Sequence, residues 1–231
     1  MKKWDDLPEM MKTEEVRPYY DLLCNKKISM VVKRLFDIFL ALILLIILLI
    51  PMIVIGVMIK LDSKGPVFYR QERVTRYGRV FKIHKFRTMV ANADKIGTQV
   101  TVGDDHRITR VGKKIRDLRL DELPQLIDVF NGDMSFVGTR PEAVKYVEKY
   151  IPEYYATLLL PAGITSEASI RFKDEARLLS EAEDVDTKYV DEVLPSKMKW
   201  NLQSIEEFNV LRDMSVMIRT ILVITTENNK L

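Results

Sequence analysis

Cysteine and histidine are scarce in this sequence of 231 residues, and its net charge is small. The single cysteine, Cys24, excludes a disulfide within the chain and a cysteine-rich metal site. The two histidines, His84 and His106, lack the spacing of a zinc motif, which argues against a zinc site. The formal net charge is only +3. The scarcity of cysteine is typical of a reducing, cytoplasmic domain. No nucleic-acid motif accompanies the basic residues, so we expect no nucleic-acid partner.

One long stretch of the chain has no charged residue. Its 22 residues, Ile38 to Ile59, would reach about 33 Å as a straight helix, enough to cross the core of a bilayer. A cleaved signal peptide would be shorter, would start earlier and would end in a small-residue cleavage site. The sequence therefore predicts a membrane helix.

Basic residues flank this stretch on both sides. Four lie between Lys26 and Arg34, and nine Lys or Arg against two acids lie between Lys60 and Arg87. Positive flanks favour the cytoplasm, so a spanning helix would have to export one of them. Pro51 should bend the helix, because it lacks an N–H and clashes with the preceding turn at a cost of about 3 kcal/mol. A helix that bends there and leaves by the face it entered satisfies both flanks; a kinked transmembrane anchor is the alternative.

The rest of the chain is long enough for one domain with a hydrophobic core. We expect a peripheral segment over residues 1–27, a re-entrant membrane helix-hairpin broken at Pro51 over 28–60, and a cytosolic, membrane-associated domain over 61–231. The predicted fold class is α+β. The cytosolic domain should be mostly helical, with a small β-hairpin and amphipathic helices at the membrane interface.

Periodicity and turn residues predict the elements of this domain. Alternating residues around Tyr77-Gly78 predict a β-hairpin of strands 67–73 and 79–87. Residues 91–105 look like a loop. Helical segments are expected over 108–120, 124–130, 141–150, 153–160, 177–193 and 204–226. Apolar residues at helical spacing between Met214 and Leu222 favour packing in the core or at the membrane interface over a site.

Adjacent carboxylates, Asp121 and Glu122, precede the helix that Pro124 should begin. Acidic residues before a helix are usually caps. Here, however, Arg116, Arg119 and Arg140 surround the pair in sequence, as phosphate chemistry requires. A carboxylate can hold Mg²⁺ or attack phosphorus to form an aspartyl phosphate.

Five motifs in register carry a resemblance to a known family. They are Phe68-Tyr69-Arg70-Gln71-Glu72-Arg73, Lys85-Phe86-Arg87-Thr88-Met89, Asp104-Asp105-His106-Arg107-Ile108-Thr109-Arg110-Val111-Gly112, Leu120-Asp121-Glu122-Leu123-Pro124-Gln125-Leu126 and Gly132-Asp133-Met134-Ser135-Phe136-Val137-Gly138-Thr139-Arg140-Pro141. Together, from about Val32 to Thr226, they resemble the bacterial sugar transferases known as monotopic phosphoglycosyl transferases, which have a re-entrant membrane helix.

The resemblance implies an enzyme that transfers a sugar 1-phosphate from a UDP-sugar to polyprenol (undecaprenyl) phosphate and releases UMP. It implies that Asp121 is the covalent nucleophile and a Mg²⁺ ligand, and that Glu122 is its catalytic partner. Substrate binding would fall to further basic residues: Lys85, Arg87, Arg119, Arg140 and Arg171. For Lys85 and Arg87, the residues alone favour a solvated or lipid-facing position on a strand.

The resemblance also implies a place at the cytoplasmic face of the bacterial inner membrane, in the first membrane step of glycan assembly. Membrane lipids and downstream glycosyltransferases would be further partners, and the oligomeric state, monomer or dimer, stays open. Three positions depart from the family pattern: His106 and Thr139 replace prolines, and Ile50 replaces a serine before Pro51. A non-catalytic membrane adaptor of a polysaccharide-assembly complex is the alternative function.

Overall fold

The computed structural model describes residues 1–93, 105–173, 175, 179 and 184–228. Its longer helices are α1 Arg17–Cys24, α2 Lys27–Asp62, α3 Arg110–Asp117, α4 Gln125–Asn131, α9 Leu194–Glu206 and α10 Val210–Asn228. Its strands are β1 Phe68–Val74, β2 Val80–Phe86, β3 Met134–Val137 and β4 Ala162–Thr165. Short helical elements complete the described chain: η1 Trp4–Asp6, η2 Glu9–Met11, η3 Arg76–Gly78, η5 Leu120–Glu122, α5 Val144–Val147, η6 Pro152–Leu159, α6 Glu167–Arg171, α8 Val185–Lys188 and η7 Tyr189–Val193. The predicted α+β class, mostly helical with small sheets, is confirmed.

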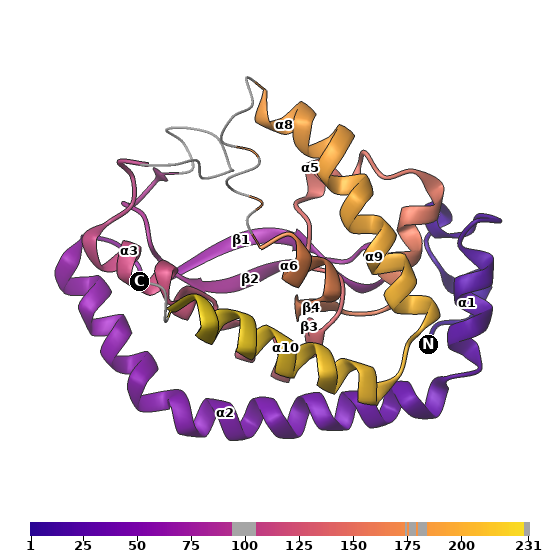
Figure 1. Cartoon of the computed structure of the whole chain (residues 1–231), viewed down its shortest axis with the longest axis horizontal. Coiled ribbons are helices and arrows are strands. Elements are labelled where there is room, and N and C mark those ends of the chain that lie inside the picture. The colour runs from indigo at the N-terminus through magenta and orange to yellow at the C-terminus, as the bar shows by residue number, and fades with distance from the viewer. Residues whose placement is uncertain (94–104, 174, 176–178, 180–183, 229–231) are drawn as a thin grey trace.

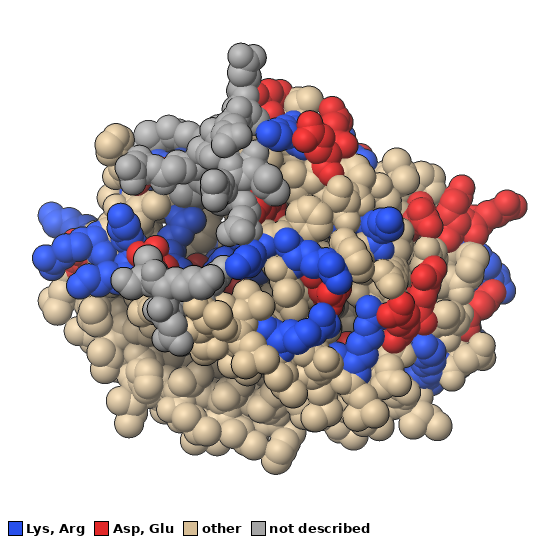
Figure 2. All heavy atoms as spheres, in the orientation of Figure 1, with Lys and Arg blue, Asp and Glu red and all other residues tan. Residues whose placement is uncertain are grey.

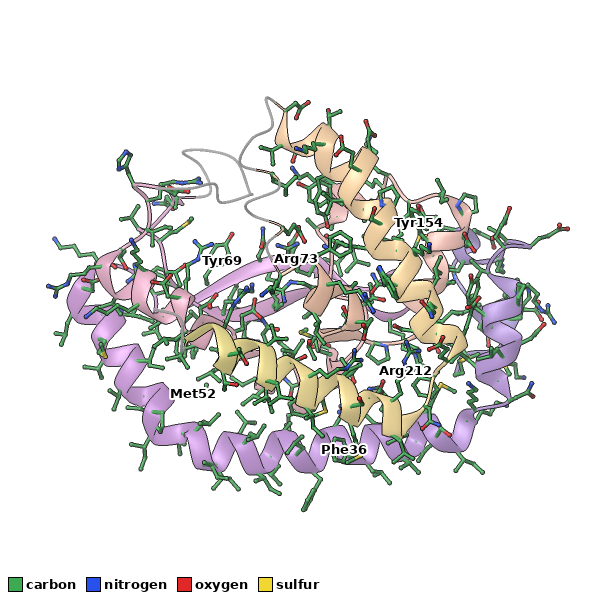
Figure 3. The ribbon with its side chains drawn as sticks, in the orientation of Figure 1. Phe36, Met52, Tyr69, Arg73, Tyr154 and Arg212 are labelled. Atoms are coloured by element: carbon green, nitrogen blue, oxygen red, sulfur yellow. The ribbon has the colours of Figure 1, made fainter. Side chains whose placement is uncertain are left out.

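Helix α2 contains the whole charge-free stretch within 36 residues. It runs beneath the other elements and changes direction near Met52, so that its last turns rise beside α3 (Figures 1 and 3). Pro51 lies at this point, inside the helix, and the helix continues on both sides of it. The predicted bend at Pro51 is confirmed, and the helix is continuous there rather than broken, because helical hydrogen bonding resumes after the proline. The re-entrant path through a membrane stays a prediction.

The two parts of α2 pack against different hydrophobic clusters. Before the bend, Ala41 joins a cluster with β2, α4, β3 and α10. After it, Ile55 and Ile59 pack with Phe86 of β2 and with α3. Both ends of one helix are thus fixed to the same small domain, and this holds the bend in place.

Charged residues near the start of α2 have partners within the protein. Lys33 is buried and its Nζ lies 2.5 Å from a carboxylate oxygen of Asp213. Arg34 donates to the carbonyl oxygens of Val129 and Phe130 at the end of α4, at 2.6 and 2.8 Å. Lys26 also donates to the Phe208 carbonyl oxygen at 2.9 Å. Three of the four basic residues that precede the apolar stretch therefore stabilise the fold, which weakens the prediction of orientation from their number.

The predicted β-hairpin is confirmed. Strands β1 and β2 pair antiparallel from Phe68 opposite Phe86 to Val74 opposite Val80. Tyr77 and Gly78 both have positive φ, 59° and 71°, in the turn between the strands. The hairpin places Lys85 on the strand that lies against η5.

A second, parallel sheet was not predicted. Strand β3 pairs with β4. At Gly163 the two backbones lie so close together that a Cβ would lie 2.2 Å from the backbone nitrogen of Gly138. All four residues of β3 are buried, so its sequence shows no alternation that could reveal a strand. This sheet carries Arg140 toward the Asp121-Glu122 turn.

Two predicted helices differ from the structure. The helix expected over 204–226 is interrupted, because α9 ends at Glu206 and α10 begins after Asn209, whose side-chain oxygen accepts from the Leu211 N–H at 2.8 Å. The helix expected over 141–150 is reduced to the single turn of α5. The predicted loop 91–105 and the first part of the predicted helix 177–193 lie mostly outside the described residues.

One face of the molecule is apolar. The lower part of Figure 2, where α2 runs, shows almost no charged side chain, whereas Lys, Arg, Asp and Glu side chains gather above it. Helix α10 adds exposed apolar side chains, namely Leu211, Met214, Ile218, Ile221 and Leu222. The hydropathy and length of α2 are sufficient for a membrane span, and only 17% of its most apolar window is buried.

Candidate active site

The Asp121-Glu122 pair lies on a short 3-10 turn, η5, between α3 and α4. Arg119 precedes this turn with φ 57° and ψ 20°, in the left-handed region that non-glycine residues seldom adopt. Such backbone conformations are often found at functional sites. The turn packs against β2 and α3, so it joins the motif around the carboxylates to the one around Lys85.

Glu122 is held by two basic side chains. Lys85 donates to its Oε1 at 3.0 Å, and both terminal nitrogens of Arg140 reach its two carboxylate oxygens. Burial alone would raise the pKa of Glu122, but Arg140 and Lys85 outweigh that effect and lower it below its usual range. Glu122 is therefore a fixed anion that orients the two cations beside it.

Asp121 has a different environment from its neighbour. Within the described chain, no side chain or backbone group forms a hydrogen bond or a close ion pair with its carboxylate. Burial and the nearby Glu122 raise its pKa, although Lys85, Arg116 and Arg140 act in the opposite direction. The carboxylate is thus close to several cations but keeps its oxygen lone pairs for another partner.

The other predicted site residues fall into two groups. Lys85 and Arg140 meet at Glu122, and Arg119 lines a cavity beside it. Arg87 instead is buried and donates to backbone carbonyls at the end of α2, including that of Ser63 at 2.8 Å. Arg171 binds Glu167 at 2.9 Å and lies 3.7 Å from the centre of the Trp200 ring. Neither of these two reaches the carboxylate pair in this structure.

Arg140 lines a polar cavity of about 150 Å³. Lys85, Arg73 and Gln125 line it together with residues from α5, η7 and α9. Among these, Lys197 and Tyr189 both bind Glu142, at 3.3 and 2.6 Å. Burial opposes the charge on Lys197, but Glu142 and Glu175 raise its pKa overall, so this wall of the cavity is a stable ionic network.

Arg140 also lines a larger cavity of about 290 Å³. Its lining includes charged residues, among them Arg119, Glu122 and Lys173. Its remaining walls are mostly apolar and come from α4, β3, β4, α6 and α10: Leu123, Leu126, Phe136, Ile164, Ile170, Val223 and Ile224. Helix α10 thus contributes residues to this cavity and also carries exposed apolar side chains, among them Ile218 and Ile221.

Sequence reasoning missed most of the polar cavity. Gln125 stands within the quoted 120–126 motif, and Glu142 follows Arg140 by two residues, so both could have been suspected from position. Tyr189 and Lys197 gave no such signal, because they reach the site only through the packing of η7 and α9.

The residues of this site could supply one carboxylate ligand to a magnesium ion. In the described part of the chain, no group of three or more His, Cys, Asp or Glu side chains could hold a metal. Mg²⁺ is often bound by one or two carboxylates together with substrate phosphates and water. Asp121, whose oxygens make no hydrogen bond with the described residues, could supply such a ligand, whereas Glu122 is engaged by Lys85 and Arg140.

The structure combines a long apolar helix with a cluster of carboxylates, a lysine and an arginine. This combination is typical of the class of membrane-associated proteins that bind phosphate groups. More particularly, the chain belongs to the bacterial sugar transferase family, whose model matches residues 28–227.

Several relatives show the same similarity. The UDP-glucose:undecaprenyl-phosphate glucose-1-phosphate transferase of Escherichia coli (strain K12) is 35% identical over 218 residues, which cover 92% of this chain and 44% of that protein. The UDP-N-acetylgalactosamine-undecaprenyl-phosphate N-acetylgalactosaminephosphotransferase of Aeromonas hydrophila is 36% identical over 178 residues, 76% of this chain and 39% of that protein. A transferase of Caulobacter vibrioides with the same name as the Escherichia coli protein is 34% identical over 201 residues, 85% of this chain and 71% of its own length. The chain thus spans less than half of the first two.

Proposed function

We propose that this protein transfers a sugar 1-phosphate from a UDP-sugar to undecaprenyl phosphate and releases UMP. The names of its relatives supply the substrate classes. The observation that carries the proposal is the arrangement around Arg140: this residue lines both a polar cavity and a more apolar cavity, and it binds Glu122 of the Asp121-Glu122 turn. This suits one water-soluble and one lipid-linked phosphate ester.

Asp121 is the nucleophile of the proposed reaction. One of its carboxylate oxygens attacks the phosphorus that bears the sugar, and the bond from that phosphorus to the bridging oxygen breaks, so that UMP leaves. A phosphate oxygen of undecaprenyl phosphate then attacks the same phosphorus and displaces Asp121, giving undecaprenyl diphosphate sugar and the free carboxylate. The covalent step lets the two anionic substrates enter separately.

The cations around Glu122 have a positioning and charge-compensating role. Arg140 and Lys85 lie next to the carboxylate pair, and their N–H groups suit phosphoryl oxygens. Because Glu122 fixes both, little reorganisation is needed when a phosphate arrives. Mg²⁺ held by Asp121 and the diphosphate of the donor would add compensation of negative charge at the transferring group.

The proposed membrane arrangement is re-entrant. Helix α2 enters the cytoplasmic leaflet, bends near Pro51 and returns, and the apolar side of α10 lies at the interface. Its support is the bend, the exposed apolar face and the attachment of both ends of α2 to one domain. In a Cys24→Ser background, Lys27→Cys and Lys64→Cys should both be labelled only from the cytoplasmic side. Labelling from opposite sides would show a spanning helix.

The activity is tested by UMP release. The full chain in nanodiscs is mixed with Mg²⁺, undecaprenyl phosphate and each of UDP-glucose, UDP-galactose, UDP-N-acetylglucosamine and UDP-N-acetylgalactosamine. We expect UMP with at least one donor, and a loss of about 1,000-fold or more in Asp121→Asn, since the amide is a poor nucleophile. Normal turnover in Asp121→Asn, or no turnover with any donor while lipid binding is retained, would contradict the proposal; the second result would favour a membrane adaptor.

A further inference from the structure

The two ends of α2 differ in what their basic side chains bind. At the start of the helix, Lys26, Lys33 and Arg34 are paired with groups of the protein itself. At the other end, Lys60 and Lys64 are exposed, and neither side chain forms a hydrogen bond or an ion pair with the described residues. The positive charge at this second end is therefore available to a partner outside the chain.

Helix α3 adds further positive charge beside these two lysines. Arg110, at its start, has 87% of its side chain exposed and lies 4.0 Å from a carboxylate oxygen of Asp62. Lys113 and Lys114 are also exposed and have no side-chain partner in the part of the chain that the structure describes. The acid of α3, Asp117, is its last residue. The end of α2 and α3 thus present a basic surface made of Lys60, Lys64, Arg110, Lys113 and Lys114.

The fold holds this basic surface in a fixed shape. The carboxylate of Asp62 accepts a hydrogen bond from the backbone N–H of Val111 at 2.9 Å, which joins the last turn of α2 to the first turn of α3. Ile55 and Ile59 of α2 pack in one hydrophobic cluster with Val111 and Ile115 of α3. Because the two helices are fixed to each other, little ordering of the backbone is needed when a partner binds.

The basic surface lies at the border of the apolar face. In Figure 2, Lys and Arg side chains gather at the left edge, directly above the apolar lower part, where Figure 1 places α3 and the end of α2. Leu61, which follows Lys60, is 83% exposed. A partner that covers this border must offer negative charge next to hydrocarbon, and an anionic phospholipid has both. A nucleic acid would leave the apolar side uncovered.

We infer that this basic surface binds the headgroups of anionic phospholipids such as phosphatidylglycerol, and that the start of α2 does not. Such lipids would lie beside α3, the helix that leads into the Asp121-Glu122 turn. Lipid binding there does not depend on the proposed reaction, because none of the five side chains belongs to the proposed catalytic group.

The experiment measures which lipids lie next to each end of α2. In a Cys24→Ser background, a bimane fluorophore is attached to the cysteine of Leu61→Cys at the basic end or of Ile28→Cys at the start. These two positions are 83% and 81% exposed, so they form a matched pair. The full chain is placed in phosphatidylcholine nanodiscs that contain a trace of spin-labelled phosphatidylglycerol or of spin-labelled phosphatidylcholine. Both leaflets of a nanodisc have the same lipids, so the comparison holds for a re-entrant and for a spanning helix.

At low salt, we expect phosphatidylglycerol to quench the fluorophore at residue 61 at least about threefold more strongly than phosphatidylcholine, because lysine and arginine attract anionic headgroups. At residue 28 the two lipids should quench about equally. A high concentration of NaCl should remove the difference at residue 61, since salt screens exposed charges.

Two pairs of substitutions test the assignment to α3. Lys113→Gln combined with Lys114→Gln should bring quenching by the two lipids at residue 61 close to equality. Lys149→Gln combined with Lys199→Gln removes the same charge from exposed positions after α5 and on α9, away from α3 in Figure 1, and should leave the ratio unchanged. Quenching by phosphatidylcholine should be the same in every variant, which shows that α2 keeps its place.

Equal quenching by both lipids at residue 61, or an unchanged ratio in Lys113→Gln with Lys114→Gln, would overturn the inference. The same preference at residues 28 and 61 would also contradict it, because the preference would then belong to the chain as a whole. If undecaprenyl phosphate equimolar with the protein removes the preference, the surface holds the acceptor lipid instead of phospholipid headgroups. None of these results bears on UMP release, which tests the proposed function separately.

Discussion

The two cavities that meet at Arg140 differ in the residues that decide what each can bind. The smaller one is walled by an ionic network of Glu142, Tyr189 and Lys197. The larger one combines charged residues with aliphatic side chains that include two residues of α10. A polar wall suits a hydroxyl-rich, water-soluble group, and an aliphatic wall suits a prenyl chain. Under the proposed function, the two steps of the transfer would use separate surfaces that share one arginine.

Arg140 should therefore be the residue whose change harms both halves of the reaction most. Arg140→Lys keeps a positive charge but cannot bind Glu122 and a phosphate with a planar fork. We expect kcat/KM to fall about 100-fold or more for both the UDP-sugar and undecaprenyl phosphate. Arg79→Lys, an exposed residue that binds Asp133, is the matched control. A loss confined to one substrate would break the idea of a shared residue.

Lys85 should affect the donor side more than the acceptor side, because it lines only the polar cavity. Lys85→Met removes the ion pair at 3.0 Å from Glu122, and we expect the rate of the first step to fall about 10- to 100-fold. Single-turnover release of UMP without acceptor measures that step. Lys82→Met, on an exposed position of the same strand, should change it little. A rise in the KM for undecaprenyl phosphate alone would contradict the assignment.

The apolar cavity is tested from α10. Val223 lines it, whereas Ile221 is 60% exposed on the apolar face of the molecule. Val223→Asp places a charge beside the prenyl chain, and we expect the KM for undecaprenyl phosphate to rise about tenfold with the first step unchanged. Ile221→Asp should instead weaken binding to vesicles. If both variants act alike, the two positions on α10 do not have separate roles.

Arg87 should have the smallest effect on either substrate, since it lies outside both cavities and binds the last carbonyls of α2. Arg87→Met leaves those carbonyls unpaired, so we expect a loss of about 1–3 kcal/mol in the free energy of unfolding and unchanged KM values. Thermal unfolding in detergent measures the loss in free energy of unfolding. Arg110→Met, which replaces an exposed side chain, is the control. A changed KM for the donor would return Arg87 to the substrate-binding residues.

Local patterns were enough to predict much of the fold. The apolar run and Pro51 predicted a bent helix, and alternation around Tyr77-Gly78 predicted the hairpin. Strand β3 was missed because it is short and wholly buried, and the start of α10 was missed although Asn209 is a good N-cap residue.

The site was predictable only where its residues belong to contiguous motifs. Asp121 and Glu122 were predicted because they are adjacent carboxylates, and Arg140 because a family motif ends beside it. The role of Arg87 depends on which groups lie next to it in three dimensions, and no spacing in the sequence contains that information.

The most direct measurement is the intact mass of the protein after mixing with the preferred UDP-sugar and Mg²⁺ in the absence of undecaprenyl phosphate. The account predicts one added sugar phosphate on Asp121, released when undecaprenyl phosphate is supplied, and no adduct in Asp121→Asn. Turnover without any adduct on rapid quenching, or an adduct that persists in Asp121→Asn, would contradict it.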